Sequence, residues 1–434
     1  MNNKIIVVDM FCGAGGASGG IDQALEELCI KARMFAIDHW SVAVSTHARN
    51  IPHAEHICEP IEKIDPLKIF PKRKIDLLWA SPECTHFSIA RGKKPGNDQK
   101  RTSPWRIIEW MEKLEVKHLI MENVKEFQDW GPLDETGHPI QSKKGAIFRA
   151  FLHAMRSLGY TVDFQILNCA DYGDPTARNR FFLQAVKGKA KISWPTPTHM
   201  ESEYNVFGLP KWRPAREIID WSIIGESIFD RKKPLVEATL KRIEHGIRRF
   251  WGPYAEPFLI SLYGTGMSRS LDRPLPTVRT SGKHSALIQP YLINNYGQSL
   301  SLDINDPHPT VTGSQHTGLI EPFLSCYDTA KRAYRLANPI PTLGTGKSAS
   351  VDDPPDTVVA KDRFALIDGD RYFFDIRYRM LLPHELSAAQ GFPRYYIFEG
   401  TKTEVIRQIG NAVPVSTARN LSRAALIQYL KEAA

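Results

Sequence analysis

The stretch Ile5-Ile6-Val7-Val8-Asp9-Met10-Phe11-Cys12-Gly13-Ala14-Gly15-Gly16-Ala17-Ser18-Gly19-Gly20 decides the fold class. Its first four residues form an apolar run of the length of a buried strand. The glycines that follow allow a tight turn and let a ligand approach the backbone, because no Cβ is in the way. Apolar residues at positions 21, 25 and 28 then show helical spacing. A strand, a glycine loop and a helix in this order predict a nucleotide-binding βαβ unit in an α/β fold.

The spacing of the glycines disfavours a dinucleotide site. The G-x-G-x-x-G pattern would need glycine at position 18, where this chain has Ser18. A second apolar run, Met34–Ile37, ends at Asp38, about 20 residues after the loop, where an acid accepts hydrogen bonds from ribose hydroxyls. A loop without a ligand and a solvent-facing Asp38 remain the alternatives. Acids on both sides of Ile61 are weaker candidates for contact with an adenine amino group.

A cysteine and a glutamate each follow a further buried strand. Ile75–Trp79 leads to Cys84, with Pro82 stiffening the approach, and His118–Met121 ends at Glu122. The carboxyl ends of parallel strands meet at one edge of a sheet, where open α/β folds place their chemistry. The pattern therefore predicts a nucleophilic cysteine with a carboxylate on the same edge. The alternative is a small buried apolar cysteine.

Two arginines lead into the next predicted strand. Arg178 and Arg180 precede Phe181–Val186, and side chains at i and i+2 of a strand point the same way. We therefore expect both to face one anion or base, with surface salt bridges as the alternative.

Length, charge and cysteine spacing narrow the class of protein. A chain of 434 residues is expected to form two or three lobes. The net charge of +8 suits a polyanionic partner, although an ordinary basic protein is the alternative. Six scattered cysteines without a C-x-x-C pair argue against a zinc site and against a disulfide framework, so we expect no metal. Neither a signal peptide nor a membrane span is apparent, and we expect a cytoplasmic protein.

A short element recurs in the second half of the chain. Pro274-Leu275-Pro276-Thr277-Val278 returns in similar form at 307–311 and 339–343, at intervals of about 33 residues, and loosely at 354–358. A fixed period of this length predicts stacked supersecondary units, here short strands with polar loops. We therefore expect a mainly β lobe with internal repeats, roughly residues 255–367, and a purely structural role for it is the alternative.

Five motifs in order resemble the DNA (cytosine-5) methyltransferases of bacterial and phage type. The resemblance covers roughly residues 4–190 and 370–420. Two positions depart from the family pattern, because Pro-Pro-Cys-Gln is here Pro-Glu-Cys-Thr and Gln-x-Arg-x-Arg begins with Thr176. The motifs are Phe11-x-Gly13-x-Gly15, Pro82-x-Cys84 with Phe87-Ser88, Glu122-Asn123-Val124, Arg178-x-Arg180 and Gly410-Asn411-Ala412-Val413-Pro414.

The resemblance implies a fold, a domain order and a set of site residues. The fold would be a Rossmann-like S-adenosylmethionine-dependent methyltransferase domain, residues 1–190 and 368–434. A mainly β target-recognition domain with internal repeats would be inserted at 191–367. Catalysis would fall to Cys84 as nucleophile, Glu122 as the acid at the base edge, Arg178 on the base oxygen O2, and Arg180. The residues expected to bind S-adenosyl-L-methionine are Asp9, Phe11, Gly13, Gly15, Gly16, Asp38, Ile61, Pro82, Asn411 and Val413.

The reaction implied is methyl transfer to carbon 5 of cytosine in double-stranded DNA at a specific sequence. The target base would be flipped out of the duplex. We expect a monomer that binds DNA and no membrane, and a cognate restriction endonuclease is a candidate partner. The rivals are an RNA cytosine methyltransferase, a catalytically inactive DNA-binding homologue and, more distantly, a nicotinamide oxidoreductase.

Overall fold

The chain divides into two compact units. Unit 1 comprises Met1–Ile218, Pro274–Gly282 and Pro383–Ala434, and unit 2 comprises Ile219–Arg273 and Lys283–Leu382. The computed structural model describes residues 4–83, 102–201, 208–228, 231–237, 239–240, 243, 258–261, 268–277, 280, 285–294, 301–303, 323–328, 348–350, 362–368 and 372–433.

The described residues of unit 1 build a seven-stranded sheet with the order β3-β2-β1-β4-β5-β8-β6. β1 pairs in parallel with both β2 and β4, while β8 runs antiparallel to β5 and β6. The order reverses at β1, and an open α/β sheet forms its ligand crevice at such a switch point. The strands are β1 (Ile5–Met10), β2 (Ala32–Asp38), β3 (Glu55–Cys58), β4 (Lys74–Ala80), β5 (Glu115–Asn123), β6 (Tyr160–Asn168) and β8 (Asn179–Lys187).

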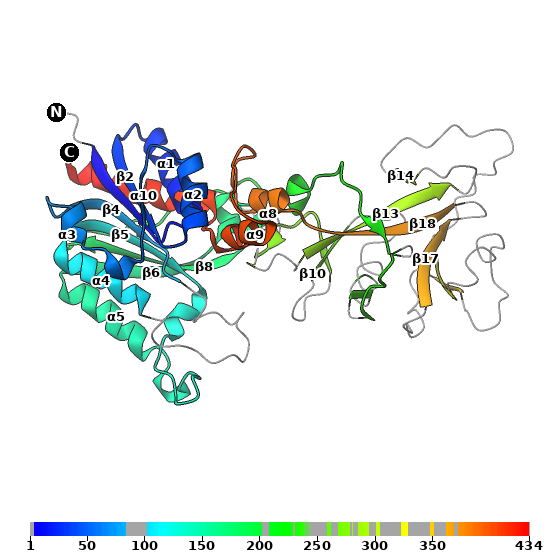
Figure 1. The fold of residues 1–434 in the computed structure, drawn as a ribbon, viewed down its shortest axis with the longest axis horizontal. Coiled ribbons are helices and arrows are strands. Elements are labelled where there is room, and N and C mark those ends of the chain that lie inside the picture. The colour runs from blue at the N-terminus through cyan, green and yellow to red at the C-terminus, as the bar shows by residue number, and fades with distance from the viewer. Residues whose placement is uncertain are drawn as a thin grey trace. The chain divides into compact units, whose positions relative to one another are not determined.

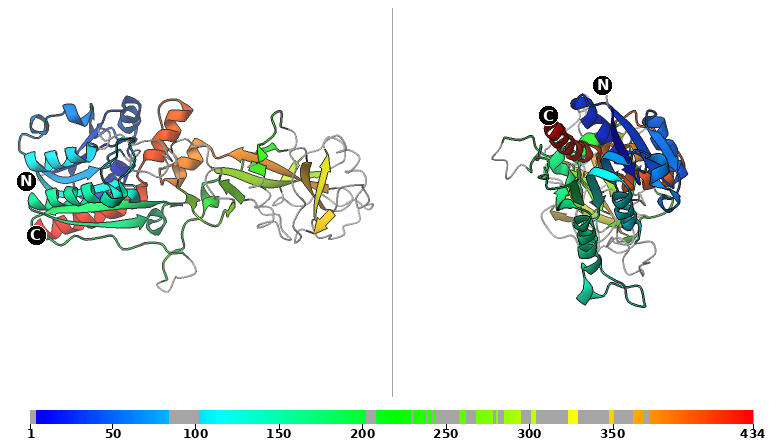
Figure 2. Two further views of the ribbon diagram at one scale, coloured as in Figure 1. Left: turned by 90° about the horizontal axis from the view of Figure 1, so that it is seen from below. Right: turned by 90° about the vertical axis from the view of Figure 1, so that its left-hand side faces the viewer.

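Helices cover both faces of this sheet, so unit 1 has three layers (Figure 1). Alternate residues of β1 enter different cores, because Val7 packs toward α1 and α10 whereas Val8 packs toward α4 and α5. In the right-hand view of Figure 2 the red final helix lies beside the blue first strands, and α10 packs against α1. The helices are α1 (Gly16–Glu27), α2 (Ser41–Asn50), α3 (Pro66–Ile69), α4 (Ser103–Lys113), α5 (Ala146–Ser157), α8 (Pro383–Ala389), α9 (Lys402–Asn411) and α10 (Val415–Ala433).

The predicted strands of the first lobe are confirmed. The expected runs are Ile5–Val8, Met34–Ile37, Ile75–Trp79, His118–Met121 and Phe181–Val186, and they lie within β1, β2, β4, β5 and β8.

The first helix begins earlier than its apolar spacing predicted. α1 starts at Gly16 rather than near position 21. A Cβ on Gly16 would lie 2.2 Å from the carbonyl oxygen of Val413, and one on Gly20 would lie 2.6 Å from Cβ of Ala418. The glycines are helical here because they let the end of the chain pack directly on α1, which outweighs their low helix propensity.

The last helix is capped from another part of the chain. α10 begins at Val415, so Ser416 lies inside its first turn and does not cap it. The buried carboxylate of Asp174 accepts hydrogen bonds from the backbone N–H of Ser416 and from both the N–H and the hydroxyl of Thr417. Within the residues that can be described, no helix is long and apolar enough to cross a membrane.

Unit 2 is mainly β, as expected for the inserted lobe. Its described strands form a nine-stranded antiparallel sheet, with β13 and β18 paired along nine residues at its centre. The strands are β9 (Glu226–Ser227), β10 (Phe258–Ser261), β11 (Ser268–Ser270), β13 (Ser285–Asn294), β14 (Ser301–Asp303), β15 (Phe323–Asp328), β16 (Ser348–Ser350), β17 (Asp362–Asp368) and β18 (Tyr372–Met380).

The first copy of the repeated element belongs to unit 1 rather than to the β lobe. Its residues Leu275–Pro276 form β12, which pairs in parallel with β7 (Thr176–Ala177). The copies at 307–311, 339–343 and 354–358 lie outside the described residues. Stacking of the repeats therefore stays a prediction.

The compact units do not end where the sequence division does. Residues 191–218 stay with unit 1, since Trp194 donates to Asp163 and Trp212 donates to Asp171 through their indole N–H groups. Residues 368–382 belong to unit 2, because β18 lies inside its sheet. The division into functional domains at 190 and 367 stays a prediction.

Candidate functional site

Two neighbouring cavities of unit 1 lie at the carboxyl ends of its parallel strands. Cavity A has a volume of about 560 Å³ and cavity B about 460 Å³, and both are lined by Phe11, Asp38, His39 and Glu83. These residues follow β1, β2 and β4, the strands that meet where the sheet order reverses. The position is the one at which open α/β sheets bind ligands. Volumes of this size suit a small organic molecule.

The loop after β1 is held in a fixed and strained shape. Phe11 has φ of +64°, a left-handed conformation that costs energy for a residue with a Cβ. The backbone N–H groups of Phe11 and Cys12 both donate to the carbonyl oxygen of Ile37, at 2.8 and 3.1 Å. Asp38 accepts from Gly13 N–H at 2.9 Å and from Trp40 N–H at 2.8 Å. The β1 and β2 loops are therefore joined through one carboxylate.

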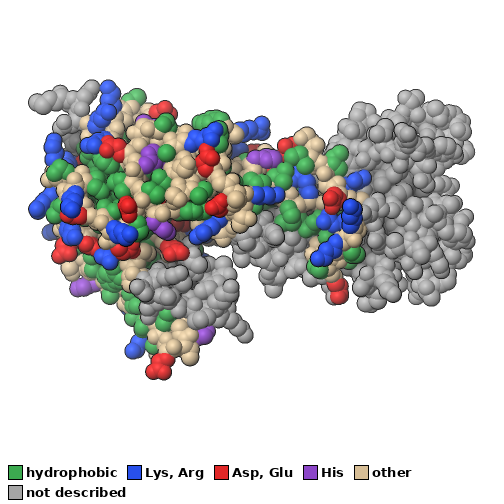
Figure 3. Space-filling model, in the orientation of Figure 1, with side chains coloured by type: hydrophobic (Ala, Val, Ile, Leu, Met, Phe, Trp, Pro, Cys, Tyr) green, Lys and Arg blue, Asp and Glu red, His purple; other side chains and the backbone are tan. Residues whose placement is uncertain are grey.

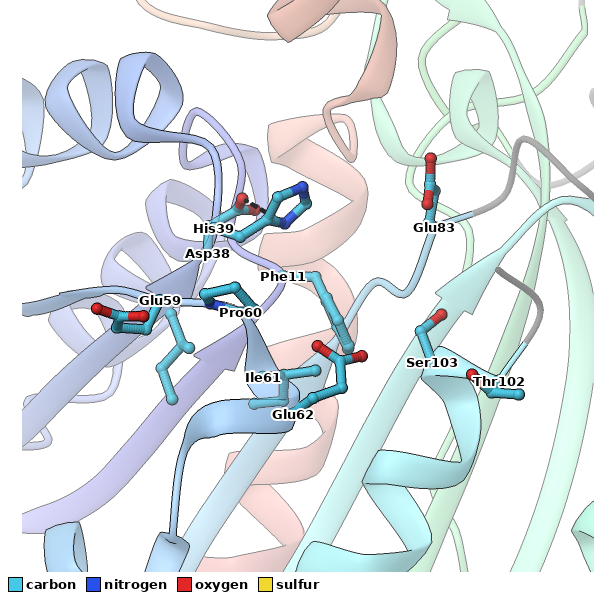
Figure 4. A pocket seen from close by; sticks show the side chains of 11 residues that line it. Phe11, Asp38, His39, Glu59, Pro60, Ile61, Glu62, Glu83, Thr102 and Ser103 are labelled. Carbon is cyan, nitrogen blue, oxygen red and sulfur yellow. Dashed lines mark ion pairs between the residues drawn. The ribbon is translucent and has the colours of Figure 1, made fainter. Parts of the chain in front are cut away.

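The ring of Phe11 lies between two groups of side chains that line cavity B. Figure 4 shows it between the Asp38–His39 pair on one side and Ile61 with Glu62 on the other, while Glu83 lies across the cavity. Ile61 is buried at the start of a 3₁₀ helix that follows β3. Cavity B thus combines apolar surfaces with several carboxylates.

A buried carboxyl group lines cavity A at the end of β5. Glu122 is 7% exposed, and the Nε of Arg180 lies 2.9 Å from its Oε1. Burial raises the pKa of Glu122, although the charges of Arg180 and Arg178 oppose the shift. The next residue, Asn123, donates from its side chain to the carbonyl oxygen of Pro82 at 3.1 Å, so β5 also fixes the start of the β4 loop.

The two arginines have different principal partners, contrary to the expectation that both would face one group. Both terminal nitrogens of Arg178 donate to the carbonyl oxygen of Gly410 at 3.1 Å, and the side chain is 2% exposed. Arg178 therefore ties the start of β8 to the end of α9. Arg180, not Arg178, forms the ion pair with Glu122.

The end of α9 supplies another wall of cavity A. Arg407, Gln408 and Asn411 line it, followed by Ala412 and Val413. The guanidinium of Arg407 lies over the ring of Trp40 at 4.6 Å, a cation–π geometry. Thr401 and Glu404 form a capping box that fixes the start of this helix.

The structure brings most of the predicted site residues together. Asp9, Gly15, Gly16, Arg178 and Arg180 do not line either cavity, and Cys84 lies outside the described residues. Gly15 and Gly16 serve close packing, because a Cβ on Gly15 would lie 2.7 Å from the hydroxyl of Tyr396. The residues that do line cavity A or B are Phe11, Gly13, Asp38, Ile61, Pro82, Glu122, Asn411 and Val413.

Several residues of the site were missed by the sequence analysis. Trp40 and Ser41 line cavity A directly after Asp38, and Arg407 lies one helical turn before Asn411. Helical spacing from Asn411 could have revealed Arg407, whereas nothing in the sequence marks the hydrogen bond from Asn123. Within the described ranges, no group of three or more His, Cys, Asp and Glu side chains could hold a metal ion.

The charges on the visible face of unit 1 are mixed. Figure 3 shows Lys and Arg interspersed with Asp and Glu there, rather than gathered into one basic area. The net positive charge of the chain is therefore not expressed as a single patch on that face. Chemically, the site combines a ligand cavity with a carboxyl group that burial makes easier to protonate, paired to a guanidinium.

Comparisons with known families and relatives agree on one group. A family model described as C-5 cytosine-specific DNA methylase matches residues 5–220 and 314–426. The Type II methyltransferase M.AgeI of Thalassovita gelatinovora is 28% identical over 201 residues, which cover 45% of this chain and 43% of that protein. The Type II methyltransferase M1.BsuMI of Bacillus subtilis is 26% identical over 261 residues, covering 56% and 55%. The chain thus spans about half the length of these relatives.

Solved structures share the fold. One is described as a putative DNA modification methyltransferase encoded within a prophage of E. coli, with a TM-score of 0.52 and 17% identity over 99% of this chain and all of that one. Another is a DNMT2 mutant of Spodoptera frugiperda, with a TM-score of 0.53 and 15% identity over 98% of this chain and all of that one.

Proposed function

Because the chain belongs to the C-5 cytosine-specific DNA methylase family, we propose that it methylates carbon 5 of cytosine in double-stranded DNA. The methyl donor is S-adenosylmethionine, and the target sequence is specific. The observation that carries the proposal is Glu122, buried against Arg180 on the wall of the same cavity that Phe11 and Asp38 line. This arrangement supports the proposal because it lets the donor and the acid that acts on the base share one cavity.

The residues of cavities A and B fit the donor. Asp38 presents its carboxylate for the ribose hydroxyls, and Phe11 and Ile61 offer apolar surfaces to the adenosyl part. Several carboxylates, Glu62 among them, lie within reach of an adenine amino group. When bound, S-adenosylmethionine supplies an electrophilic methyl group on a positively charged sulfur. Pro82, Asn411 and Val413 enclose the other side of cavity A.

Glu122 and Arg180 act on the edge of the cytosine ring. A glutamic acid whose pKa is raised by burial can donate a proton to ring N3 and accept from the exocyclic amine. In this proposal Arg180 orients the carboxyl group through their ion pair and stabilises charge at O2. The resemblance gave this role to Arg178, and we propose Arg180 instead because its guanidinium pairs directly with Glu122, whereas both terminal nitrogens of Arg178 donate to the carbonyl of Gly410.

Cys84 is the nucleophile in this proposal. Its thiolate adds to carbon 6 of the flipped base, which makes carbon 5 electron-rich enough to accept the methyl group. Loss of the proton from carbon 5 then releases the cysteine and restores the ring. β4 ends at Ala80, four residues before Cys84, on the same sheet edge as Glu122.

In this proposal, unit 2 recognises the DNA sequence and contributes no catalytic residue. Contacts to base edges specify a sequence, whereas contacts to phosphates position the duplex. Polar side chains that suit base edges and phosphates occur along unit 2, with Arg269 on β11 and Arg273 just after it. Further residues of this kind lie outside the described residues: Lys283, His284, Gln315, His316 and Lys347, together with Arg279, which falls in the segment assigned to unit 1. A monomeric state and a cognate restriction endonuclease also belong to the proposal.

The full chain should be incubated with methyl-labelled donor and either duplex DNA or RNA, and the modified nucleosides identified by mass spectrometry. We expect 5-methylcytosine in DNA, at one sequence context. Label in RNA alone would support the rival RNA enzyme, and no label with intact donor and DNA binding would support an inactive homologue.

A cysteine variant tests the mechanism. Cys84→Ser should reduce turnover by at least ~100-fold, because a serine hydroxyl is scarcely ionised at neutral pH. Cys29→Ser, at an exposed cysteine after α1, is the matched control and should keep full activity. A duplex with 5-fluorocytosine should form a covalent adduct with the wild type. Near-native turnover of Cys84→Ser would refute the role.

A further inference from the structure

Four polar side chains form a hydrogen-bonded chain that begins beneath the glycine loop. The hydroxyl of Ser18 donates to Asp9 Oδ2 at 2.6 Å, and Nε2 of His47 lies 2.9 Å from that hydroxyl oxygen. Nδ1 of His47 lies 2.8 Å from Nε2 of His56. Asp9, Ser18 and His47 are fully buried, whereas His56 is half-buried. We call this set the Asp9 relay.

The relay links β1, α1, α2 and β3, and it packs against the glycine loop itself. A Cβ on Gly15 would lie 3.1 Å from Cδ2 of His47. The charge of Asp9 reaches cavity A, because burial and then the nearby Asp9 raise the pKa of Cys12, which lines that cavity. Asp9 thus acts on the cavity without lining it.

The hydrogen bonds of the relay can run in either direction. His56 is also hydrogen-bonded to the backbone of Ala54, a contact that raises its pKa and is therefore donated by the ring to a carbonyl. Neutral His56 then accepts from His47 at Nε2, His47 accepts from Ser18, and Ser18 accepts from a protonated Asp9. When every donor is reversed, Asp9 is a carboxylate and His56 an imidazolium. In total, one proton has moved from Asp9 to His56, because Ser18 and His47 each accept one proton and donate another.

Burial lowers the pKa of His56 overall, so a proton that reaches His56 passes on to solvent. The protonation of Asp9 can still change near neutral pH. Burial raises the pKa of Asp9 to about 7. Burial lowers the pKa of His47 to about 3, so His47 is neutral in both arrangements and only its tautomer changes. Oδ1 of Asp9 has no hydrogen-bond partner among the described residues, which favours the uncharged acid. The other titratable groups that act on Asp9, His47 or His56 are Asp38, Cys12, Tyr396 and His53.

We propose that the Asp9 relay lets Asp9 release a proton to His56 and solvent when a cation occupies cavity A. Ionised Asp9 then adds a negative charge near the cavity, which favours binding of a sulfonium donor. When the uncharged thioether product remains, Asp9 takes up a proton again and this negative charge is lost. The relay residues are positioning groups that favour exchange of product for donor. The identity of the ligand rests on the proposed function, whereas the relay itself does not.

Calorimetry of ligand binding tests the coupling. The donor and its product S-adenosylhomocysteine share the adenosine and amino-acid groups, so a difference in proton release between them reports the sulfonium charge. With Asp9 half protonated at pH 7, the wild type should release up to about half a proton more with the donor, measured in two buffers of different ionisation enthalpy. The ratio of donor to product affinity should rise between pH 6 and pH 8.

Two variants should abolish these differences. Asp9→Asn keeps the size of the side chain but cannot change charge, and His47→Gln cannot exchange tautomers. His153→Gln, at an exposed histidine on α5, is the matched control and should behave as the wild type. If Asp9→Asn does not fold, His47→Gln still decides the question. Equal proton release by the wild type and both variants would overturn the proposal.

A measurement without ligand separates this proposal from the proposed function. In histidine labelled with ¹⁵N, the resonances of His47 should change from one neutral tautomer to the other with a midpoint near pH 7. The change should be absent in Asp9→Asn. If the donor does not bind at all, the proposed function fails while the tautomer shift still supports the relay. A His47 tautomer that is independent of pH refutes the relay whether or not the donor binds.

Discussion

Replacement of Glu122 by glutamine separates its chemical role from its structural one. The variant Glu122→Gln keeps the shape of the side chain and one oxygen near Arg180, but it cannot donate a carboxyl proton. Because burial already raises the pKa of Glu122, the charged form is costly to bury and a neutral isostere avoids that cost. Loss of the ion pair with Arg180 acts in the other direction. Removing one partner of a buried ion pair typically costs about 3–5 kcal/mol, and because glutamine avoids burying a charge at this position we expect the free energy of unfolding to fall by less than that.

The effect of Glu122→Gln on turnover should be much larger than its effect on DNA binding. Removing one group that stabilises charge in a transition state typically costs about 2.7–4 kcal/mol, or about 10²–10³ in kcat. Because this interaction strengthens only as charge develops on the base, DNA affinity should change by less than about threefold. If Glu122 acts as the acid, kcat of the wild type falls as pH rises through its raised pKa, and the variant lacks this decrease.

Single-turnover methyl transfer and DNA titration measure the two effects separately. Glu109→Gln on α4 is the matched control, since Glu109 is likewise an ion-paired glutamate but lies at the surface, where it pairs with Arg106 and Lys113. Its free energy of unfolding should change by about 0.5 kcal/mol or less, with normal turnover. The reasoning is refuted if Glu122→Gln weakens DNA binding as much as it slows turnover, or if turnover is unchanged.

Other predictions test how the chain holds the site together. Gly16→Ala should lower the urea midpoint and weaken donor binding, because its Cβ would lie 2.2 Å from a backbone oxygen. Gly19→Ala on the same helix should be neutral or stabilising by up to ~1 kcal/mol. Equal urea midpoints of the two variants would contradict this. Burial raises the pKa of Asp174 from 3.8 to about 6, so its contribution to stability is present below pH 4 and is lost as pH rises through 6. Urea titrations should show Asp174→Asn without this slope, and an unchanged slope would exclude Asp174 as its source. Exchange of unit 2 with that of a relative of different specificity should move the methylated sequence, read by sequencing modified cytosines, and a hybrid with the original target would contradict the assignment.

The sheet and its ligand edge could be predicted because their signals are local. Ile5–Val8 is a continuous apolar run, Ile75–Trp79 is apolar apart from Asp76, and the polar residues and glycines that follow mark strand ends directly. The resemblance to the cytosine-5 methyltransferases, drawn from motifs in order, is confirmed by the family match. Cavity A then gathers most of those motifs at one place.

Features that depend on distant contacts could not be predicted in this way. The alternation of side chains suggested one common partner for Arg178 and Arg180, yet the terminal nitrogens of Arg178 donate to a carbonyl 232 residues away. The cap of α10 comes from Asp174, which lies far from this helix along the chain. The repeat pattern likewise gave no sign that Leu275–Pro276 would pair with β7 of unit 1. Periodicity describes one element at a time and carries no information on which element lies next to it.

Cavity A is built from both ends of the chain, and this sets the time at which it can form during protein synthesis. Gly13 precedes Arg407 and Val413 by nearly 400 residues along the chain. At about 5–20 residues per second, this interval is roughly 20–80 s. The nascent chain therefore contains the strands of unit 1 long before it contains every wall of cavity A. A ligand that needs the complete cavity is expected to bind only after α9 has been synthesised.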